Sequence, residues 1–326
     1  MKLLLTGVTG KVGSHFLTNF LNSERFSSWE VVALCNNRVI EETDRVSVIR
    51  GSIADSSVVQ SALSGVTHVL HMAAVKESPD LVIDVAIKGM FNLLEAFRQS
   101  PSSQQFMLIS GDCTVGHIFH EYQGPITEAA PRRAYPGCYA LTKVLEEVML
   151  EQYQFQYGIN GCCLRAPWIM EKDDFRHVLS FGDDQFGGPA WATLLSKNEV
   201  ERYQSGRFVP VLLDVNGDPL RRNFVHVSDL ASAILAALDC EAARGELFNI
   251  AMNEPIDYAR VGDYLQASRN YSIAEISSPY FSNWLDNSKA RLRLNWRPEI
   301  NTEALVDRAW NYKRPKNEPR KIWYPG

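Results

Sequence analysis

The chain has 326 residues, and its 33 lysines and arginines stand against 38 aspartates and glutamates, which gives a formal net charge of −5. Apolar residues make up 45% and charged residues 22%, proportions that are ordinary for a soluble globular protein. The acidic balance argues against a nucleic-acid or anionic-membrane partner, because either would favour a basic surface. The six cysteines form neither metal-type CxxC pairs nor a dense disulfide framework. Since no apolar run reaches the roughly 18 residues that span a bilayer, we expect a cytoplasmic protein.

Short apolar runs alternate with helical segments along the first half of the chain. The strands expected from these runs are 3–5, 31–34, 46–49, 66–70, 106–109 and 161–164. The helices expected between them are about 11–22, 56–64, 79–99 and 137–157. Strands that alternate with helices predict an α/β fold with a parallel sheet covered on both faces.

The pattern changes after residue 165. Residues 166–221 are rich in loop residues, and Asn216-Gly217 predicts a hairpin turn. The α/β pattern returns with a strand at 223–227, a helix at 228–240 and a strand at 247–250. Residues 257–312 are expected to be mostly helical.

Three glycines with GxxGxxG spacing lie between the first strand and the first helix. Gly7 permits a tight turn, Gly10 lets backbone approach a pyrophosphate, and Gly13 allows the helix to pack closely on the strand. A turn that needs glycine only for packing is the alternative, but this position favours a dinucleotide whose phosphates lie on the helix N-terminus. The residues of this loop expected to contact the cofactor are Gly7, Thr9, Gly10, Lys11, Val12 and Gly13.

The end of the second strand bears on the choice between NAD and NADP. A carboxylate there would accept from the ribose 2′-hydroxyl of NAD, whereas an arginine would favour the 2′-phosphate of NADP. The chain has Cys35-Asn36-Asn37-Arg38 at this position and no carboxylate. Arg38 is either a phosphate partner or an ordinary solvated arginine. We expect NAD or NADP as the cofactor, and Arg38 favours NADP.

A YxxxK pair begins the helix expected at 137–157. Tyr139 and Lys143 are four residues apart and therefore lie on one helix face. A free phenol has a pKa near 10, but an adjacent ammonium stabilises the phenolate and brings it toward neutral pH. The pattern is common by chance, yet after a strand–glycine loop–helix unit it indicates a catalytic base.

These motifs resemble those of the extended short-chain dehydrogenase/reductases of the NAD-dependent epimerase/dehydratase family, and the likeness covers nearly the whole chain. Further segments match the family in the expected order. They are Val69–Ala74 (VxHxAA), Gly89–Ala96 (GTxNLLEA), Arg222–Asp229 (RDFVHVDD) and Leu294–Pro298 (LGWxP).

The resemblance implies a Rossmann-type doubly wound sheet in residues 1–165, with 222–250 returning to it, and a smaller substrate lobe from 166–221 and 251–326. It also implies a homodimer formed through the helices near 79–99 and 137–157, to which Val144, Leu145, Val148 and Met149 could contribute. The further cofactor contacts that it implies are Ser52, Ile53, Met72, Ala73, Ala74 and Pro167, beside Asn36, Arg38, Tyr139 and Lys143.

The chain departs from the family at the Ser or Thr that follows the fifth strand. Matching forward from that strand puts Asp112 at the catalytic position, whereas counting back from Tyr139 gives Thr114. An ionised Asp112 would raise the pKa of the phenol, so it would have to be protonated or act as an acid or base itself. Thr114 would supply the usual hydroxyl. Both assignments stay open, as does a rebuilt loop in which neither residue serves.

Three residues are expected at the substrate: His117, Trp168 and Arg222. The resemblance implies that Arg222 matches an arginine that binds the substrate pyrophosphate in sugar-nucleotide enzymes, although Arg222 could also be a surface arginine or one that bridges the lobes. His117 and His120 are three residues apart, but no third ligand is in view, so we expect no metal.

Together these features predict an oxidoreductase or epimerase that acts on a hydroxyl-bearing carbon of a sugar, sugar acid or sugar nucleotide. Tyr139 would take the hydroxyl proton while the nicotinamide accepts the hydride. The alternative is a catalytically altered NAD(P)-binding sensor or structural protein, which the changed Ser/Thr position permits.

Overall fold

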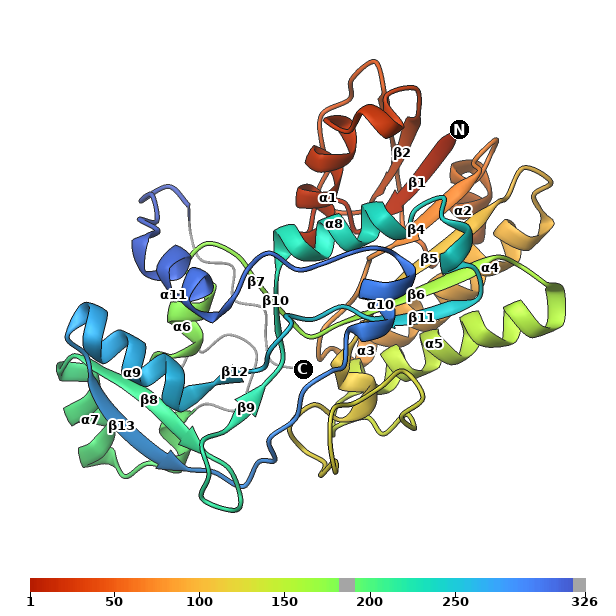
Figure 1. Ribbon diagram of the computed structural model, residues 1–326. Helices are drawn as coiled ribbons and strands as arrows, with labels where there is room; N and C mark the ends of the chain where they lie inside the picture. Colours follow the sequence, from red (N-terminus) through yellow and green to blue (C-terminus); the bar gives the residue numbers. More distant parts are fainter. Residues whose placement is uncertain (182–190, 319–326) are drawn as a thin grey trace.

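The computed structural model describes residues 1–181 and 191–318. Within these residues, seven parallel strands form the central sheet, in the order β11-β6-β5-β4-β1-β2-β3 (Figure 1). Their bounds are β1 Lys2–Thr6, β2 Glu30–Cys35, β3 Val46–Arg50, β4 His68–His71, β5 Gln105–Gly111, β6 Gly161–Ala166 and β11 Glu246–Asn249. The sheet confirms the expected α/β fold of the Rossmann type, and the run expected at 247–250 supplies its edge strand.

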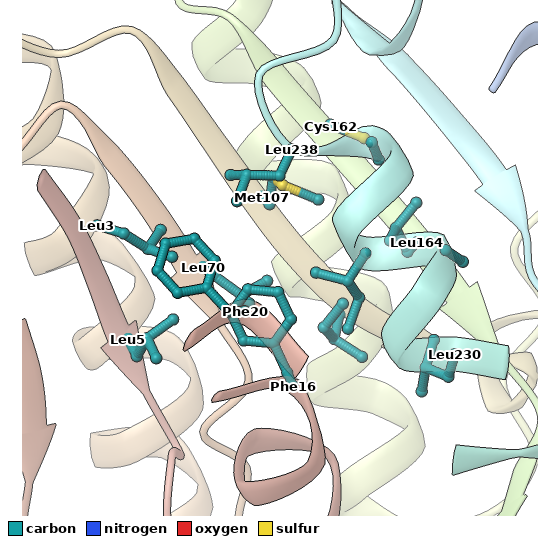
Figure 2. Packing of buried hydrophobic residues seen from close by; sticks show 14 of the residues in the cluster. Leu3, Leu5, Phe16, Phe20, Leu70, Met107, Cys162, Leu164, Leu230 and Leu238 are labelled. Carbon is teal, nitrogen blue, oxygen red and sulfur yellow. The ribbon is translucent and has the colours of Figure 1, made fainter. Parts of the chain in front are cut away.

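Helices cover both faces of this sheet. The bounds are α1 Lys11–Leu21 and α8 Val227–Ala237 on one face, and α2 Ser56–Ala62, α4 Gly89–Gln99 and α5 Cys138–Tyr157 on the other. Alternate side chains of a strand point to opposite faces. Leu3 and Leu5 accordingly pack with Phe16 and Phe20 of α1 (Figure 2), whereas Leu4 belongs to the cluster under α2, α4 and α5.

The helix expected at 79–99 is interrupted. It consists of α3 Pro79–Val82, a π-helical stretch at Ile83–Lys88, and α4. The described residues also include four short 3₁₀ turns, at Glu24–Phe26, Asp112–Val115, Trp191–Leu194 and Glu241–Ala243.

A third apolar cluster lies away from the central sheet, around β8 Phe208–Leu213 and β13 Ser272–Ser277, which pair in parallel. The remaining elements are α6 Asp174–Val178, α7 Lys197–Ser205, α9 Tyr258–Arg269, α10 Ser288–Arg293 and α11 Thr302–Asn311, with the short strands β7 Trp168–Met170, β9 Arg221–Arg222, β10 Phe224–His226 and β12 Ile256–Asp257. The cluster draws on β8, β13, α6, α9 and α11 (Figure 1).

Two expectations for this half of the chain were wrong in part. The stretch 257–312 is not mostly helical, because β13 alternates buried Ala274 and Ile276 with exposed Glu275, the period of a strand. The strand expected at 223–227 exists as β10, but it pairs with β7 rather than with the central sheet. The turn expected at Asn216-Gly217 is confirmed: Gly217 has φ +85°, and Asp214 N donates to Asp218 O at 2.7 Å.

No helix among the described residues combines the length and apolarity that a membrane crossing would require.

Candidate active site

The glycine-rich loop leaves β1 at Thr6 and enters α1 at Lys11. Gly7 has φ +71°, and a Cβ added there would lie 2.6 Å from Ala73 N. A Cβ on Gly13 would lie 2.4 Å from Gly7 O, so only glycine permits these close approaches. Gly10 is the N-cap of α1, and no side chain caps that end. Such an uncapped helix N-terminus beside a close backbone approach fits a pyrophosphate.

A buried hydrogen-bond cluster joins the ends of β1 and β4. Thr6 Oγ1 lies 2.7 Å from His71 Nδ1 and accepts from the backbone N–H groups of Met72 and Ala73 at 3.3 Å each. Burial lowers the pKa of His71 to about 3, so the imidazole is neutral at pH 7. The cluster thereby fixes Met72–Ala74 beside the glycine loop, where these residues were expected to line the cofactor.

The residues expected near the ribose lie at the ends of β2 and β3. Asn36 and Arg38 are exposed in the turn after β2. Ser52 Oγ accepts from Ala54 N at 3.2 Å, and Ile53 is buried with its carbonyl accepting from Asn92 Nδ2 at 3.0 Å. Exposed Arg38 is sterically able to meet a phosphate, and nothing in its surroundings decides between the two cofactors.

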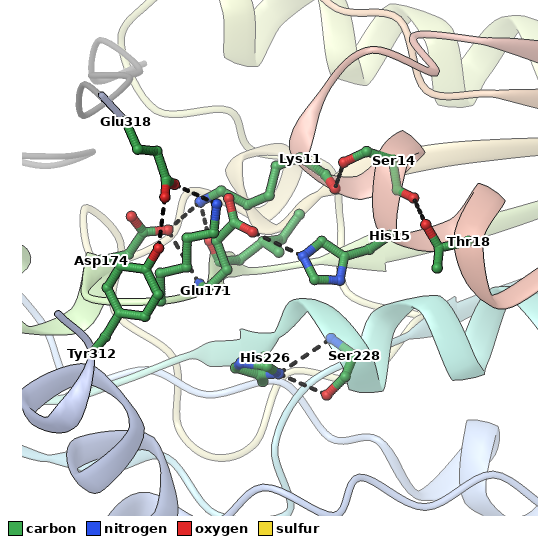
Figure 3. Close-up of polar contacts among 12 residues, drawn as sticks. Lys11, Ser14, His15, Thr18, Glu171, Asp174, His226, Ser228, Tyr312 and Glu318 are labelled. Carbon is green, nitrogen blue, oxygen red and sulfur yellow. Dashed lines mark hydrogen bonds and ion pairs between the residues drawn. The ribbon is translucent and has the colours of Figure 1, made fainter. Parts of the chain in front are cut away.

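The side chain of Lys11 contacts β7 and the start of α6. Its Nζ donates to Ile169 O at 2.9 Å and to Asp174 Oδ2 at 2.5 Å. One turn further along α1, His15 Nε2 lies 2.8 Å from Glu171 Oε2 (Figure 3). The glycine loop is therefore tied to the start of α6 by charged contacts. Pro167, expected at the cofactor, is buried just before β7.

The segment after β7 is held in turn by residues near 312–318. Lys172 Nζ donates to Glu318 Oε1 at 2.5 Å, and Arg314 donates to Asp173. Tyr312 Oη donates to Glu318 Oε2 at 2.7 Å (Figure 3). These contacts form a continuous charged network from α1 to the end of the described chain.

Tyr139 and Lys143 lie in the first turns of α5, as expected. Glu77, from the loop after β4, caps this helix by accepting from the backbone N–H of Cys138 at 2.9 Å and of Tyr139 at 3.3 Å. Lys143 Nζ donates to Ile109 O at 3.1 Å and to Glu146 Oε2 at 2.7 Å. The ammonium of Lys143 is thus paired with a fully buried carboxylate.

A second lysine lies against Tyr139. Lys76 Nζ is 3.5 Å from the centroid of the Tyr139 ring, within the range of a cation–π contact. Burial raises the pKa of Tyr139 well above 10, and the neighbouring Cys113, Tyr135, Glu146 and Asp112 raise it further. Lys76 and Glu77 were not among the residues expected at the site. Their position directly after the VxHxAA stretch, at the carboxyl end of β4, was the available signal.

Asp112 and Thr114, the two alternatives for the hydroxyl position, both lie in the 3₁₀ turn after β5 and are both buried. Thr114 Oγ1 donates to Gly111 O at 2.9 Å and to Glu147 Oε1 at 3.1 Å, so its hydroxyl faces the interior. Asp112 is directed elsewhere, since its Oδ2 lies 2.6 Å from His117 Nδ1.

His117, Trp168 and Arg222, the three residues expected at the substrate, are brought together. Arg222 Nη2 donates to His117 Nε2 at 2.5 Å, and its guanidinium carbon lies 3.9 Å from the centroid of a Trp168 ring. Burial lowers the pKa of His117, which Asp112 opposes. A neutral His117 that donates from Nδ1 to Asp112 leaves Nε2 to accept from Arg222, so the contacts fix the tautomer.

Arg222 is fully buried. Its Nη1 donates to Tyr258 Oη at 3.3 Å, whereas its Nε has no hydrogen-bond partner among the described residues. A buried guanidinium N–H without an acceptor is expensive to leave in this state. The residue is therefore equipped to receive one more acceptor.

Glu147, which was not expected at the site, is a buried centre of polar contacts. Its carboxylate accepts from Ser110 Oγ at 2.6 Å, from Arg132 Nε at 3.0 Å and from Arg165 Nη2 at 2.8 Å, besides the bond from Thr114. Burial raises its pKa, but Arg165 and the hydrogen bonds outweigh this and leave the pKa below its usual value. Glu147 holds the turn after β5 against α5 and β6.

The described residues include no group of three or more His, Cys, Asp or Glu side chains that could hold a metal ion. His120 lies with its Nε2 3.4 Å from Ala134 O, while His117 is used by Asp112 and Arg222.

Comparison with known proteins places the chain in a family. The model of the NAD dependent epimerase/dehydratase family matches residues 3–251. A UDP-glucuronate 4-epimerase from Thermodesulfobacterium geofontis is 24% identical over 79% of this chain and 74% of its own length.

Solved structures share the fold. A short-chain dehydrogenase/reductase superfamily protein from Agrobacterium tumefaciens with bound NAD has a TM-score of 0.76 and 21% identity, covering 95% of this chain and 96% of the other. The UDP-glucuronic acid 4-epimerase from Bacillus cereus in complex with UDP-glucuronic acid and NAD has a TM-score of 0.71 and 22% identity, covering 96% and 98%. The neighbours were solved with NAD, and they give no support to a preference for NADP. The protein belongs to the NAD-dependent epimerase/dehydratase family.

Proposed function

We propose that this protein is an NAD(P)-dependent oxidoreductase or epimerase that acts on a hydroxyl-bearing carbon of a sugar, sugar acid or sugar nucleotide. The observation that carries the proposal is the placement of the Tyr139–Lys143 helix at the same carboxyl edge of the sheet as the uncapped N-terminus of α1. Ligands of open α/β sheets bind at this edge. The sugar-nucleotide complex of the Bacillus cereus relative supports the substrate class.

Tyr139 is the proton acceptor in this proposal. As the substrate C–H bond breaks, the O–H proton passes to the Tyr139 phenolate and the carbon becomes a carbonyl. NAD(P), when bound, supplies the acceptor for the hydride. Return of the hydride to the other face of the carbonyl gives an epimer, and release of the carbonyl gives net oxidation. Both outcomes share the first half-reaction.

We assign the orientation of the substrate oxygen to Asp112 rather than to Thr114. The Thr114 hydroxyl is occupied by Gly111 O and Glu147, whereas Asp112 is close enough to Tyr139 to raise the pKa of its phenol. The hydrogen bond from His117 holds the Asp112 carboxyl in one orientation. Asp112, which stands where the family has Ser or Thr, therefore still provides a polar group near the Tyr139 phenol.

We assign an anionic group of the substrate to Arg222. Its unpaired Nε is a donor that a carboxylate or phosphate oxygen would satisfy. Trp168 stacks on the guanidinium and on His117, and these contacts hold Arg222 in place. A sugar acid and a sugar nucleotide both carry such a group.

The direct test follows nicotinamide absorbance while the protein is incubated with NAD or NADP and a panel of sugars, sugar acids and sugar nucleotides. Net reduction of the cofactor identifies a dehydrogenase, and an isomeric product without net reduction identifies an epimerase. Cofactor binding without conversion of any compound in the panel would contradict the enzymatic proposal.

That last result would point to a cofactor-binding sensor, and one observation favours this second candidate. Lys143 is paired with buried Glu146, so the positive charge that a YxxxK enzyme needs beside its tyrosine is partly neutralised.

Arg38→Ala tests the cofactor preference. If Arg38 meets a 2′-phosphate, the variant should bind NADP more weakly by about 1–3 kcal/mol, the scale of a hydrogen bond to a charged group, while its affinity for NAD changes little. Fluorescence titration with both cofactors measures this, with Arg291→Ala on α10 as an exposed control. Equal losses for NAD and NADP would remove the reason to expect NADP.

A homodimer through α4 and α5 is the assembly we propose. Exposed apolar side chains lie on these helices: Phe91 is 49% exposed, Leu141 51% and Leu145 37%. Val144 and Val148 are half-buried, and Met149 packs toward the sheet.

Light scattering should give twice the 36.8 kDa chain mass. Leu141→Asp should shift the protein to a monomer, because a charge cannot be buried there without a partner. A wild-type monomer at micromolar concentration would contradict the dimer.

A further inference from the structure

Two lysines lie close to Tyr139, and their surroundings differ. Lys76 comes from the loop after β4 and places its Nζ 3.5 Å from the centroid of the Tyr139 ring. Lys143 comes from α5 itself and donates to Ile109 O and to Glu146 Oε2. The Lys76 ammonium therefore lies on the face of the phenol ring, whereas the Lys143 ammonium is engaged by groups of β5 and α5.

The pairing of Lys143 limits what its charge contributes. Glu146 is fully buried, and its Oε2 is 2.7 Å from Lys143 Nζ. Burial raises the pKa of Glu146, and Lys143 opposes this rise by favouring the carboxylate. In its ionised form, Glu146 offsets the field of the Lys143 ammonium at a third group nearby. Glu146 also acts directly on the phenol, since it is among the groups that raise the pKa of Tyr139.

The other groups that face Tyr139 oppose the phenolate as well. Those that raise its pKa are Asp112 and Cys113 from the turn after β5, Tyr135 from the loop before α5 and Glu146 from α5. Glu77, from the loop after β4, accepts from the Tyr139 backbone N–H. Burial also raises the pKa of Tyr139 and is the largest cause of the shift. A cation beside the phenol acts in the opposite direction and favours the phenolate.

Lys76 is suited to this task. Burial lowers the pKa of Lys76 to about 8, and Lys143 lowers it as well, whereas Cys113 and Asp112 favour the ammonium form. The side chain therefore stays protonated at neutral pH. A cation over an aromatic face is attracted to the electron-rich ring, and the attraction increases when the ring carries a phenolate charge.

We propose that Lys76 is a positioning residue for Tyr139, whose ammonium on the ring face favours the phenolate, while Glu146 offsets the charge of Lys143. The inference rests on the proposed function in so far as the phenolate is the catalytic base. Lys76, which lies outside the YxxxK pair, supplies positive charge beside the phenol in place of the charge of Lys143 that Glu146 offsets.

The test measures the ionisation of residue 139 without substrate. 3,5-Difluorotyrosine introduced at position 139 ionises at lower pH than tyrosine, and its ¹⁹F resonance reports the protonation state. The titration is run on the full chain, with and without saturating NAD. Lys76→Met should raise the midpoint by about one to three pH units, the range for loss of an adjacent opposite charge. Lys76→Arg, which keeps the charge, should restore a midpoint near that of the parent protein.

Glu146→Gln should move the midpoint in the opposite direction, because it removes a carboxylate and leaves the charge of Lys143 uncompensated. Lys88→Met, which removes an exposed lysine from the π-helical stretch, is the matched control and should leave the midpoint unchanged. If Lys76→Met fails to fold, Lys76→Gln takes its place. An unchanged midpoint in the neutral Lys76 variant, or an equal rise in Lys76→Arg, would overturn the inference, and so would a rise in Glu146→Gln.

This readout separates the inference from the proposed function. If the midpoints shift as described and Tyr139→Phe still converts substrate at the wild-type rate, the effect of Lys76 on the phenol is supported and the catalytic role of Tyr139 is contradicted. If Tyr139→Phe is inactive and the midpoints do not move, only the role of Lys76 is contradicted.

Discussion

Tyr139→Phe should lower turnover by about 10²–10⁴-fold, because the variant retains the ring and loses only the hydroxyl that transfers the proton. This corresponds to about 3–5 kcal/mol of activation free energy. Cofactor affinity should stay nearly unchanged, since the glycine loop and the uncapped end of α1 are untouched. Steady-state kinetics with the substrate found by the absorbance screen, together with a cofactor titration, measure both quantities.

Tyr157→Phe is the matched control for this experiment. Tyr157 lies at the far end of the same helix, where it is 49% exposed and contacts Arg98, so the loss of its hydroxyl should leave turnover unchanged. Wild-type turnover in Tyr139→Phe would overturn the mechanism and favour the sensor candidate.

Glu147→Gln should lower the free energy of unfolding by about 3–5 kcal/mol, the usual result of removing one partner from a buried ion pair. Gln keeps the shape of the side chain but removes the charge that Arg165, 1% exposed, requires. Chemical denaturation monitored by tryptophan fluorescence measures the loss. Glu151→Gln removes an exposed carboxylate that pairs with the same Arg132, and it should lower stability by less than about 1 kcal/mol.

The effect of Glu147 should depend on pH. Because the folded-state pKa lies below the usual 4.5, the carboxylate stabilises the fold fully above pH 4.5, and this contribution disappears as pH falls through the folded-state value. The difference between wild type and Glu147→Gln should therefore be largest near neutrality and decrease in acid. A difference that grows on acidification would mean that Glu147 is protonated in the native protein.

Much of the fold could be predicted because the central strands are continuous apolar runs, and strands buried on both faces give this signal directly. The strands outside the central sheet were harder to recognise. Residues 208–213 lie in a stretch dominated by loop signals, and Ser272–Ser277 shows only a half-buried alternation between two helices. The pairing of β10 with β7 depends on tertiary contacts that no local pattern encodes.

The candidate site could be predicted where function requires a residue type at a fixed spacing. Glycines at 7 and 13 and the Tyr139–Lys143 pair meet this condition. The contact of Lys76 with Tyr139 could not be predicted in this way, because it joins residues 63 positions apart through a loop conformation. The ion pair between Lys143 and Glu146 was easier to predict, since an i, i+3 spacing on a helix brings two side chains together. Many such pairs face solvent, however, so the spacing alone does not predict a buried pair.

The ion pair between Lys11 and Asp174 joins residues separated by 163 positions. At about 5–20 residues per second, a ribosome needs roughly ten to thirty seconds to make the intervening segment. The N-terminal strands can begin to assemble earlier, whereas the charged network that steadies the glycine loop forms only after Asp173, Arg314 and Glu318 have also emerged. During translation, the charged contacts around the glycine loop are therefore completed well after the loop itself has been made.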